Sequence, residues 1–263
     1  MTGRRPAFAV DLDGTLGHAE PVDGGLPIRG RTTASYLAPA ALDRLAALSR
    51  RIDLVVATGR SASTVADFKR HFAAAGVRVA GWILEHGTVV ADRPDWEEKV
   101  LAGIDLSGVW DGIEAIISAE GLPIEVDYYR ADRRATVVLS GKGPVLAEYL
   151  IDRAAPVLGN RFRSLVGKRK ITLIPVRATK EAAFARAFGD TRELSFAAGD
   201  TADDLGLLRE TGYPLTLAGA AEPVRRYVAN RGGFVASGGG HAGTIAIIDE
   251  IAARLDRSAP GPP

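Results

Sequence analysis

The chain of 263 residues contains no cysteine and a single methionine. Without cysteine it can form no disulfide framework, offers no thiolate nucleophile and cannot build a cysteine zinc site. Long apolar runs are also missing, because no stretch approaches the roughly 18 residues that a membrane span requires. The apolar stretch behind the basic start is too short for the core of a signal peptide. These absences predict a protein without membrane spans, and we expect it to be cytoplasmic.

The sequence has almost no excess of either charge, with 33 basic residues, 32 acidic residues and a net charge of +1. Such a balance creates no strong field over the whole chain, so we expect neither nucleic acid nor a membrane surface as a partner. Hydrophobic residues make up 46% of the chain, enough to bury a core in one large domain or two smaller ones. Nothing in the composition specifies an oligomeric state.

The first part of the chain alternates short apolar strands with amphipathic helices. Strands are predicted at residues 8–10, 52–57 and 82–84, as mostly apolar runs of the kind that a parallel sheet buries on both faces. Apolar residues at helical spacing within 42–48 and 65–72 predict the two connecting helices. The order β-α-β-α-β predicts a doubly wound, mainly parallel α/β core with right-handed crossovers.

The pattern changes at about residue 95. From there to residue 174, two helix patterns are each followed by paired strand-like runs, at 124–129 with 135–139 and at 162–166 with 170–174. Runs joined by short polar turns predict hairpins, so residues 95–174 should form an inserted α+β unit of order αββαββ. The βα pattern then returns, which makes residues 1–94 and 175–263 one Rossmann-like core that the insertion interrupts.

Polar side chains follow three predicted core strands at the point where each strand ends. They are Asp11 and Asp13 after residues 8–10, Thr58, Gly59 and Arg60 after residues 52–57, and Asp200 and Asp204 after residues 194–198. Lys180 opens the helix that follows the insertion. Ligands of open α/β sheets bind beyond the carboxyl ends of the strands, so we expect these segments to converge on one site.

Two carboxylates at the end of a buried strand are costly unless a positive charge neutralises them. Mg²⁺ prefers hard oxygen ligands, and we expect it here. Asp11 and Asp200 would supply carboxylate oxygens and Asp13 its backbone carbonyl, with Asp204 completing the predicted metal-site residues. Phosphoryl transfer through an aspartyl phosphate uses such a set, because a cation and Lys180 together offset the repulsion between two anions.

Each catalytic residue has a predicted role in that chemistry. Asp11 would attack phosphorus, and Asp13 would protonate the leaving alkoxide and later activate water. Thr58 and nearby backbone amides would hold the phosphoryl oxygens. Two alternatives stay open: Thr58 as a cap of the following helix, and Lys180 as a surface lysine at a helix start.

The segments DLDGTL, ATGR, RATKEAAF and GDTADD resemble, in this order, the four motifs of the haloacid dehalogenase (HAD) superfamily of phosphotransferases. The resemblance covers nearly the whole chain and implies a HAD-like catalytic core with residues 95–174 as a cap that sets substrate specificity. ILEHGTVV, the cap pattern and KITLIPVRATK are similar to the sugar-phosphatase branch, which includes trehalose-6-phosphate, sucrose-6-phosphate and mannosyl-3-phosphoglycerate phosphatases. This similarity implies a Mg²⁺-dependent phosphatase acting on a small phosphorylated sugar or polyol.

Substrate contacts are predicted on both sides of the cleft between core and cap. They are Gly59, Arg60 and His86 in the core, and Glu125, Arg130, Lys168 and Lys170 in the cap. His86 as a hydrogen-bonded loop histidine, and the cap lysines as solvated charges, are the alternatives. Two other functions stay open as well: a phosphomutase, and a catalytically silent regulator that binds a phosphorylated ligand.

Overall fold

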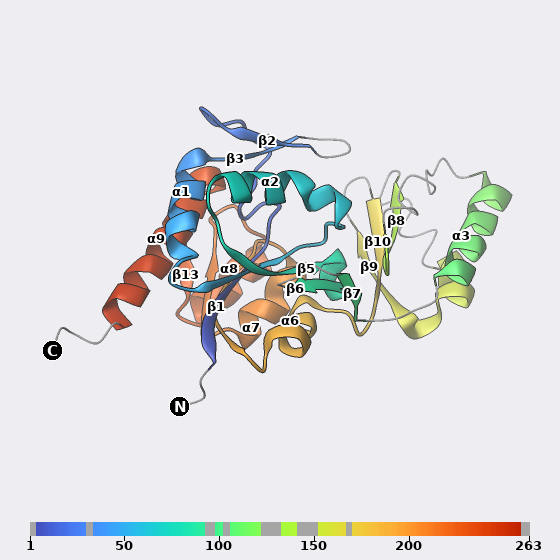
Figure 1. Ribbon diagram of the computed structural model, residues 1–263. Helices are drawn as coiled ribbons and strands as arrows, with labels where there is room; N and C mark the ends of the chain where they lie inside the picture. The colour runs from blue at the N-terminus through green and yellow to red at the C-terminus, as the bar shows by residue number, and fades with distance from the viewer. Residues whose placement is uncertain are drawn as a thin grey trace.

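The computed structural model describes residues 4–29, 34–92, 98–101, 106–121, 133–140, 152–166 and 170–258. Figure 1 shows a large sheet with helices on both faces and a smaller unit beside it. The strands of the large sheet are, in spatial order, β13 (Phe234–Val235), β12 (Tyr213–Thr216), β11 (Arg192–Ala198), β1 (Arg5–Val10), β4 (Asp53–Ala57), β5 (Val79–Leu84), β6 (Val89–Asp92) and β7 (Glu98–Val100). Neighbouring strands from β13 to β5 are parallel, whereas β6 and β7 add antiparallel pairs at one edge.

The side chains of β1 alternate between two hydrophobic clusters. Phe8 and Val10 belong to one cluster, and Ala7 and Ala9 to the other, as expected for a strand buried on both faces. Residues of α1 (Pro39–Leu48), α2 (Ala66–Ala74) and α9 (Gly240–Ser258) complete the first cluster. Residues of α6 (Lys180–Phe188), α7 (Leu205–Glu210) and α8 (Glu222–Asn230) complete the second. The predicted doubly wound α/β core is therefore confirmed.

A glycine in β5 lets α6 lie close to the sheet. A Cβ atom at Gly81 would lie only 2.5 Å from the ring of Phe188, the last residue of α6. The helix thus packs directly on the strand backbone at its carboxyl end. Its first residue, Lys180, is buried with 2% of its surface exposed.

The smaller unit, which we call the cap, has its own sheet and its own core. It contains α3 (Ser107–Glu120), β8 (Val137–Ser140), helical residues 152–158, β9 (Phe162–Val166) and β10 (Lys170–Pro175). The antiparallel order β8-β10-β9 confirms the predicted pairing of residues 162–166 with 170–174. Trp110 and Ile113 of α3 pack on this sheet. The strand predicted at 124–129 and the helix pattern at 145–150 lie outside the described residues.

Several short elements have no counterpart among the sequence predictions. β2 (Leu26–Ile28) and β3 (Ser35–Leu37) form a separate antiparallel hairpin between Asp13 and α1. β6, β7 and β13 extend the large sheet, and β7 does so from within the predicted insertion. Among the described residues, no helix combines the length and apolar character needed to span a membrane.

Candidate active site

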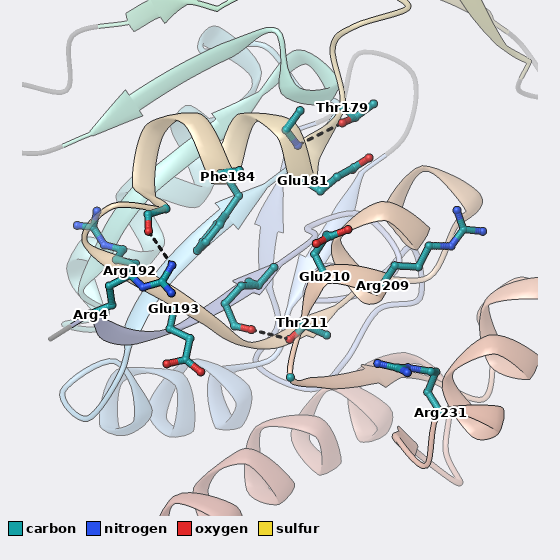
Figure 2. Close-up of a pocket in the computed structure, with 15 residues that line it drawn as sticks. Arg4, Thr179, Glu181, Phe184, Arg192, Glu193, Arg209, Glu210, Thr211 and Arg231 are labelled. Atoms are coloured by element: carbon teal, nitrogen blue, oxygen red, sulfur yellow. Dashed lines mark hydrogen bonds between the residues drawn. The ribbon is translucent and has the colours of Figure 1, made fainter. Parts of the chain in front are cut away.

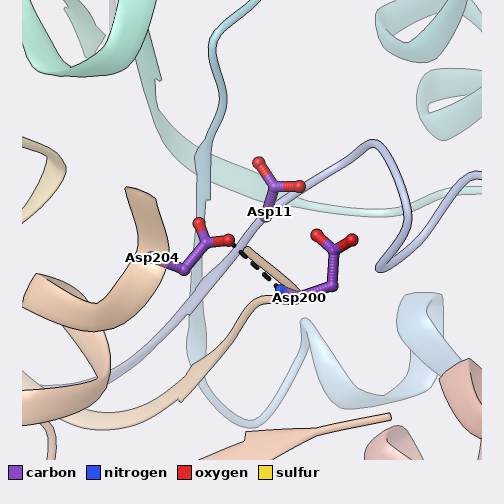
Figure 3. Close-up of side chains that lie close together, drawn as sticks. All are labelled: Asp11, Asp200 and Asp204. Atoms are coloured by element: carbon purple, nitrogen blue, oxygen red, sulfur yellow. Dashed lines mark hydrogen bonds between the residues drawn. The ribbon is translucent and has the colours of Figure 1, made fainter. Parts of the chain in front are cut away.

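Three carboxylates meet at the carboxyl end of the large sheet. Asp11 directly follows β1, and its N–H donates to the carbonyl of Ala198 at the end of β11 (3.0 Å). Asp200 lies two residues beyond β11, and Asp204 ends the short 3₁₀ turn η4 (Ala202–Asp204). Each carboxylate offers one oxygen, and these oxygens lie within 4.8 Å of one another. Figure 3 shows Asp11 lying beside Asp200 and Asp204, which both come from the segment after β11.

The loop after β1 approaches Asp200 through a glycine. Gly14 has φ +84°, a conformation that side-chain-bearing residues rarely adopt. A Cβ atom there would lie 2.3 Å from Oδ2 of Asp200, so the residue must also be glycine for lack of space. The Oγ1 atom of Thr15 adds a 3.5 Å hydrogen bond to Oδ1 of Asp200. The glycine therefore brings the loop that carries Asp13 against the acidic cluster.

Lys180 bridges two of these acids. Its Nζ donates to Oδ1 of Asp11 (2.8 Å) and to Oδ1 of Asp204 (2.7 Å). Burial by itself lowers the pKa of Lys180, but Asp11, Asp204 and Asp203 together raise it above its ordinary value. A cation at the first position of α6 opposes the helix dipole, so these carboxylates are what keep it there. The surface-lysine alternative is excluded by its burial.

The acidic cluster carries more negative charge than one ammonium group neutralises. Burial raises the pKa of Asp11 well above its usual range, and the charges of Asp204 and Asp200 add to this effect against the attraction of Lys180. Burial and Asp204 raise the pKa of Asp200 to about 6. A buried excess of hard carboxylate oxygens fits a divalent cation such as Mg²⁺, which would favour the ionised forms.

Asp204 also organises the loop that carries Asp200. Its Oδ2 atom accepts the backbone N–H groups of Asp200 (3.2 Å) and Thr201 (3.0 Å), while Oδ1 accepts from Lys180. The N–H of Asp204 in turn donates to the side chain of Thr201, which completes a capping box. One carboxylate therefore links the lysine helix to the loop after β11.

Arg60 contacts Asp13 rather than standing free at the rim. Its Nε and Nη2 atoms donate to the two carboxylate oxygens of Asp13 at 2.7 Å and 2.6 Å, a bidentate pair. Thr58 is buried, and its Oγ1 accepts the N–H of Arg60 (3.2 Å). The next helical turn begins only at Ser63, so Thr58 caps no helix. A substrate contact of Arg60 stays a prediction.

His86 lies in a network that joins the core to the cap. It belongs to the 3₁₀ turn η2 (Glu85–Gly87), and its Nδ1 lies 2.8 Å from Oδ2 of Asp203. Arg163 of β9 donates to the other oxygen of Asp203 at 3.0 Å. Burial lowers the pKa of His86 although Asp203 opposes this shift. The ring also packs on Gly59, where a Cβ atom would lie 2.3 Å from Cε1 of His86. The hydrogen-bonded loop alternative is thus realised, and a substrate contact is a prediction still.

Two cap residues face the core site. Arg133 donates through Nη1 to the carbonyl of Gly59 at 2.7 Å. Lys170 keeps an exposed surface, yet desolvation and the nearby charges of Arg133 and Arg60 lower its pKa while Asp13 raises it. The charge of Asp13 in the core therefore acts on Lys170 of the cap. Neither Arg133 nor Arg163 was predicted, because no local pattern marks a residue whose partner lies in another domain.

The remaining predicted cap contacts, Glu125, Arg130 and Lys168, lie outside the described residues.

A cavity of about 740 Å³ lies away from the acidic cluster (Figure 2). It is bordered by α6, the start of β11 and the segment before β12, at the amino ends of the strands. Its lining includes charged side chains of both signs, namely Arg4, Arg192, Arg209, Arg231, Glu181, Glu193 and Glu210. None of the carboxylates of the cluster lines it, so the two features are separate.

No protein-family model matches the chain, and no curated protein matches it at a significant level. Solved structures do resemble it. A haloacid dehalogenase-like hydrolase from Bacteroides thetaiotaomicron is 16% identical with a TM-score of 0.68, over 94% of this chain and 100% of the other. A HAD/COF-like hydrolase from Plasmodium vivax is 13% identical with a TM-score of 0.68, over 96% and 97%. A member of a phosphoryl-transfer superfamily, studied for a trigonal-bipyramidal intermediate, is 15% identical with a TM-score of 0.64, over 95% and 99%. The chain therefore has the HAD-like fold, core and cap together.

Proposed function

We propose that the protein is a Mg²⁺-dependent phosphomonoester hydrolase that acts on a small phosphorylated sugar or polyol through an aspartyl phosphate. The observation that carries the proposal is the buried cluster of Asp11, Asp200 and Asp204 bridged by Lys180. It lies at the end of a parallel sheet where such folds bind ligands. The HAD-like fold and the hydrolases that share it support the same reaction class.

In the first proposed step, a carboxylate oxygen of Asp11 attacks phosphorus and the bond from phosphorus to the leaving oxygen breaks. Asp13 gives a proton to the leaving alkoxide. Lys180 stabilises the negative charge that develops on the phosphoryl oxygens, and Thr58 with nearby amides orients them. The residues that would hold Mg²⁺ are Asp11, Asp200, Asp204 and, through its backbone carbonyl, Asp13. The bound cation would supply positive charge that offsets the repulsion between carboxylate and phosphate.

In the second proposed step, water attacks the phosphorus of the aspartyl phosphate. Asp13 takes the proton of that water, inorganic phosphate leaves and the carboxylate of Asp11 is restored. The bidentate pair with Arg60 holds both carboxylate oxygens of Asp13 in one orientation. Arg60 therefore takes part in both proposed steps as an orienting group.

Two residues of the cap support the proposal of a small polar substrate. Arg133 contacts Gly59 of the core from the cap, the charge of Asp13 acts on Lys170, and both cap residues offer donors to hydroxyl or phosphate oxygens. A cytoplasmic location is part of the same proposal, and it rests on composition alone.

The test is a phosphate-release assay over phosphorylated sugars, polyols, glycerates and nucleotides, with Mg²⁺ and without any bisphosphate primer. We expect hydrolysis of at least one sugar or polyol phosphate, loss of activity with a chelator and recovery with Mg²⁺. Asp11→Asn should lower turnover by at least about 10³-fold because it removes the attacking oxygen. Asp43→Asn on the exposed side of α1 is the matched control and should behave as the parent protein.

Each contrary result has a distinct meaning. Turnover that requires a bisphosphate primer would identify a phosphomutase instead. Phosphate binding without turnover on any substrate would identify a silent binder. Activity restored by zinc alone would refute the magnesium assignment.

A further inference from the structure

The loop between β5 and β6 holds a buried carboxylate that the proposed reaction does not use. Glu85 is 1% exposed, and its oxygens accept four hydrogen bonds from the cap. The donors are the backbone N–H groups of Arg134 (2.9 Å), Ala135 (3.2 Å) and Thr136 (3.1 Å) and the hydroxyl of Thr136 (2.8 Å). Consecutive backbone amides that converge on one anion form a strong binding site for it without a cation.

The backbone of this loop is shaped for the contact. Glu85 and His86 have φ values of 47° and 61°, which are uncommon for residues other than glycine. Such conformations persist where surrounding contacts over-determine them. At Gly87 a Cβ atom would lie 2.2 Å from the carbonyl oxygen of Thr179, in the connection between the cap and α6. One core loop therefore touches both the cap and a chain segment that leads out of it.

Among the described residues, the other hydrogen bonds and ion pairs between cap and core come from long side chains. Arg133 donates to the carbonyl of Gly59, and Arg163 pairs with Asp203. An arginine can follow a moving partner by changing rotamers, because its side chain has several free torsions. The amides that bind Glu85 move only when the cap backbone itself moves. The Glu85 contact therefore specifies the orientation of the cap at the level of the main chain.

We propose that Glu85 is a positioning residue that fixes the orientation of the cap, so that the arrangement in which Arg133 contacts Gly59 and Arg163 contacts Asp203 is the resting state of the free protein. The Glu85 contact ties the backbone of the cap to the loop after β5, and it therefore restricts rotation of the cap relative to the core. Moving the cap away would break all four charge-assisted hydrogen bonds to Glu85 at once. This proposal concerns the free protein and holds whether or not the chain is a phosphatase.

The orientation of the cap is measurable with spin labels, because a chain without cysteine accepts them only at introduced positions. Ala73 on α2 and Ala119 on α3 are exposed residues of core and cap. Double electron–electron resonance on the labelled Ala73→Cys, Ala119→Cys protein should give one narrow distance distribution without any ligand. Adding Glu85→Gln, which turns an NH₂ group toward the cap amides, should at least double its width.

Glu98→Gln is the matched control. Glu98 on β7 reaches the same cap residue, Arg134, but through a side-chain ion pair of 3.6 Å. This variant should keep the narrow distribution of the parent. A broad distribution in the parent would overturn the proposal. A Glu85→Gln protein with a lower melting temperature but an unchanged distribution would also overturn it, since Glu85 would then serve stability alone.

Thr136 supplies a milder change in case Glu85→Gln does not fold. Thr136→Val removes only the hydroxyl donor to Glu85, and it should broaden the distribution less than Glu85→Gln. Thr136→Ser keeps the hydroxyl and should restore the parent width. Equal widths in the Val and Ser variants, with no folded Glu85→Gln protein, would overturn the proposal.

Discussion

The side chain of Asp13 is held by a residue from another strand end. Arg60 binds both of its oxygens, and bidentate pairing of this kind is directional as well as strong. The Asp13 side chain still keeps 48% of its surface exposed, so water reaches it. In the proposed reaction Arg60 therefore orients a carboxylate that exchanges protons on its open side.

The two proposed roles of Asp13 are separable with a leaving group that needs no proton. In Asp13→Asn, p-nitrophenyl phosphate should still transfer its phosphoryl group to Asp11, whereas hydrolysis of the aspartyl phosphate lacks its base. We expect a burst of about one equivalent of nitrophenolate and then steady turnover at least about 10²-fold slower than in the parent. Stopped-flow absorbance measures both phases. Steady turnover at the parent rate would remove Asp13 from the mechanism.

His18 is a buried histidine beside a second one. Its Nε2 lies 2.7 Å from the hydroxyl of Thr244, which donates its own proton to the carbonyl of Thr15. His18 is thus the donor in that contact and is neutral in the native state. Burial, with a contribution from the charge of His241, lowers the pKa of His18 from 6.5 to about 4.

This shift predicts how stability depends on pH. Between pH 6.5 and about 4 the unfolded chain binds a proton at His18 that the native protein does not bind, so the free energy of unfolding falls as pH falls. The contribution is at most about 3 kcal/mol over this range. Urea unfolding at several pH values should show a smaller fall in His18→Gln than in the parent. Equal decreases of the free energy of unfolding in the two proteins would show that a group other than His18 causes the loss of stability at low pH.

At the residue scale, the sequence could predict which strand ends carry the acids, because a strand end followed by polar residues is a local pattern. The structure brings Asp11, Asp200, Asp204 and Lys180 together as those positions imply. The role of Glu85 could not be predicted in this way. Its partners are backbone groups about 50 positions further along the chain, and no side-chain pattern records such a contact.

Among the elements, helix α6 depends on the residue at its N-cap. Thr179 accepts the N–H of Ala182 through Oγ1 at 3.2 Å, and Lys180 is the next residue. In the first turn of α6 the charge of Lys180 opposes the helix dipole and that of Glu181 favours it, so the hydrogen bond to Thr179 is a separate stabilising contact at this helix start. The glycine contact between β5 and α6 then holds the helix on the sheet.

Loss of the N-cap hydrogen bond of Thr179 should measurably lower the free energy of unfolding. Thr179→Ala removes the acceptor, and we expect it to lower the free energy of unfolding by about 1 kcal/mol. Thr179→Ser keeps the acceptor and should recover most of the loss. Urea denaturation of the three proteins makes the comparison. A Ser variant as unstable as the Ala variant would show that the methyl group of Thr179, and not its N-cap hydrogen bond, stabilises the protein.

The elements that the sequence predicts well are those with several periods of their pattern. α1, α2 and α6 show repeated apolar positions, and β4 is apolar from Leu54 to Ala57. β2, β3, β7 and β13 have only two or three residues each, too few for any period to emerge. These short strands form because a neighbouring strand offers its free edge, which is a tertiary cause.

In the whole molecule, the cap and the core have separate hydrophobic clusters, so changes in one need not disturb the packing of the other. The acids of the candidate site are in the core, whereas Lys170 belongs to a cap strand. If the cap recognises the substrate and the core supplies the phosphate chemistry, the two contributions should separate on mutation.

Lys170→Met tests that separation. We expect kcat/KM for the preferred sugar phosphate to fall by about 10-fold or more, because a substrate hydrogen bond is lost, while p-nitrophenyl phosphate is hydrolysed almost as before. Lys99→Met, at an exposed lysine of β7, is the control and should change neither value. Lys180→Met should damage both reactions, since it acts on the phosphoryl group common to them. Equal losses on both substrates in Lys170→Met would deny the cap a role in specificity.

The central position of β1 in the sheet has a consequence for how the chain folds during its synthesis on the ribosome. Phe8 in β1 pairs with Phe196 in β11, and translation at about 5–20 residues per second separates them by roughly 10 to 40 seconds. During that interval one edge of β1 has no partner, and an unpaired apolar strand invites aggregation. The first 90 residues thus wait for the last third of the chain, and Asp11, the proposed nucleophile, is made long before Asp200 and Asp204. A nascent chain should therefore depend on chaperones until β11 has emerged.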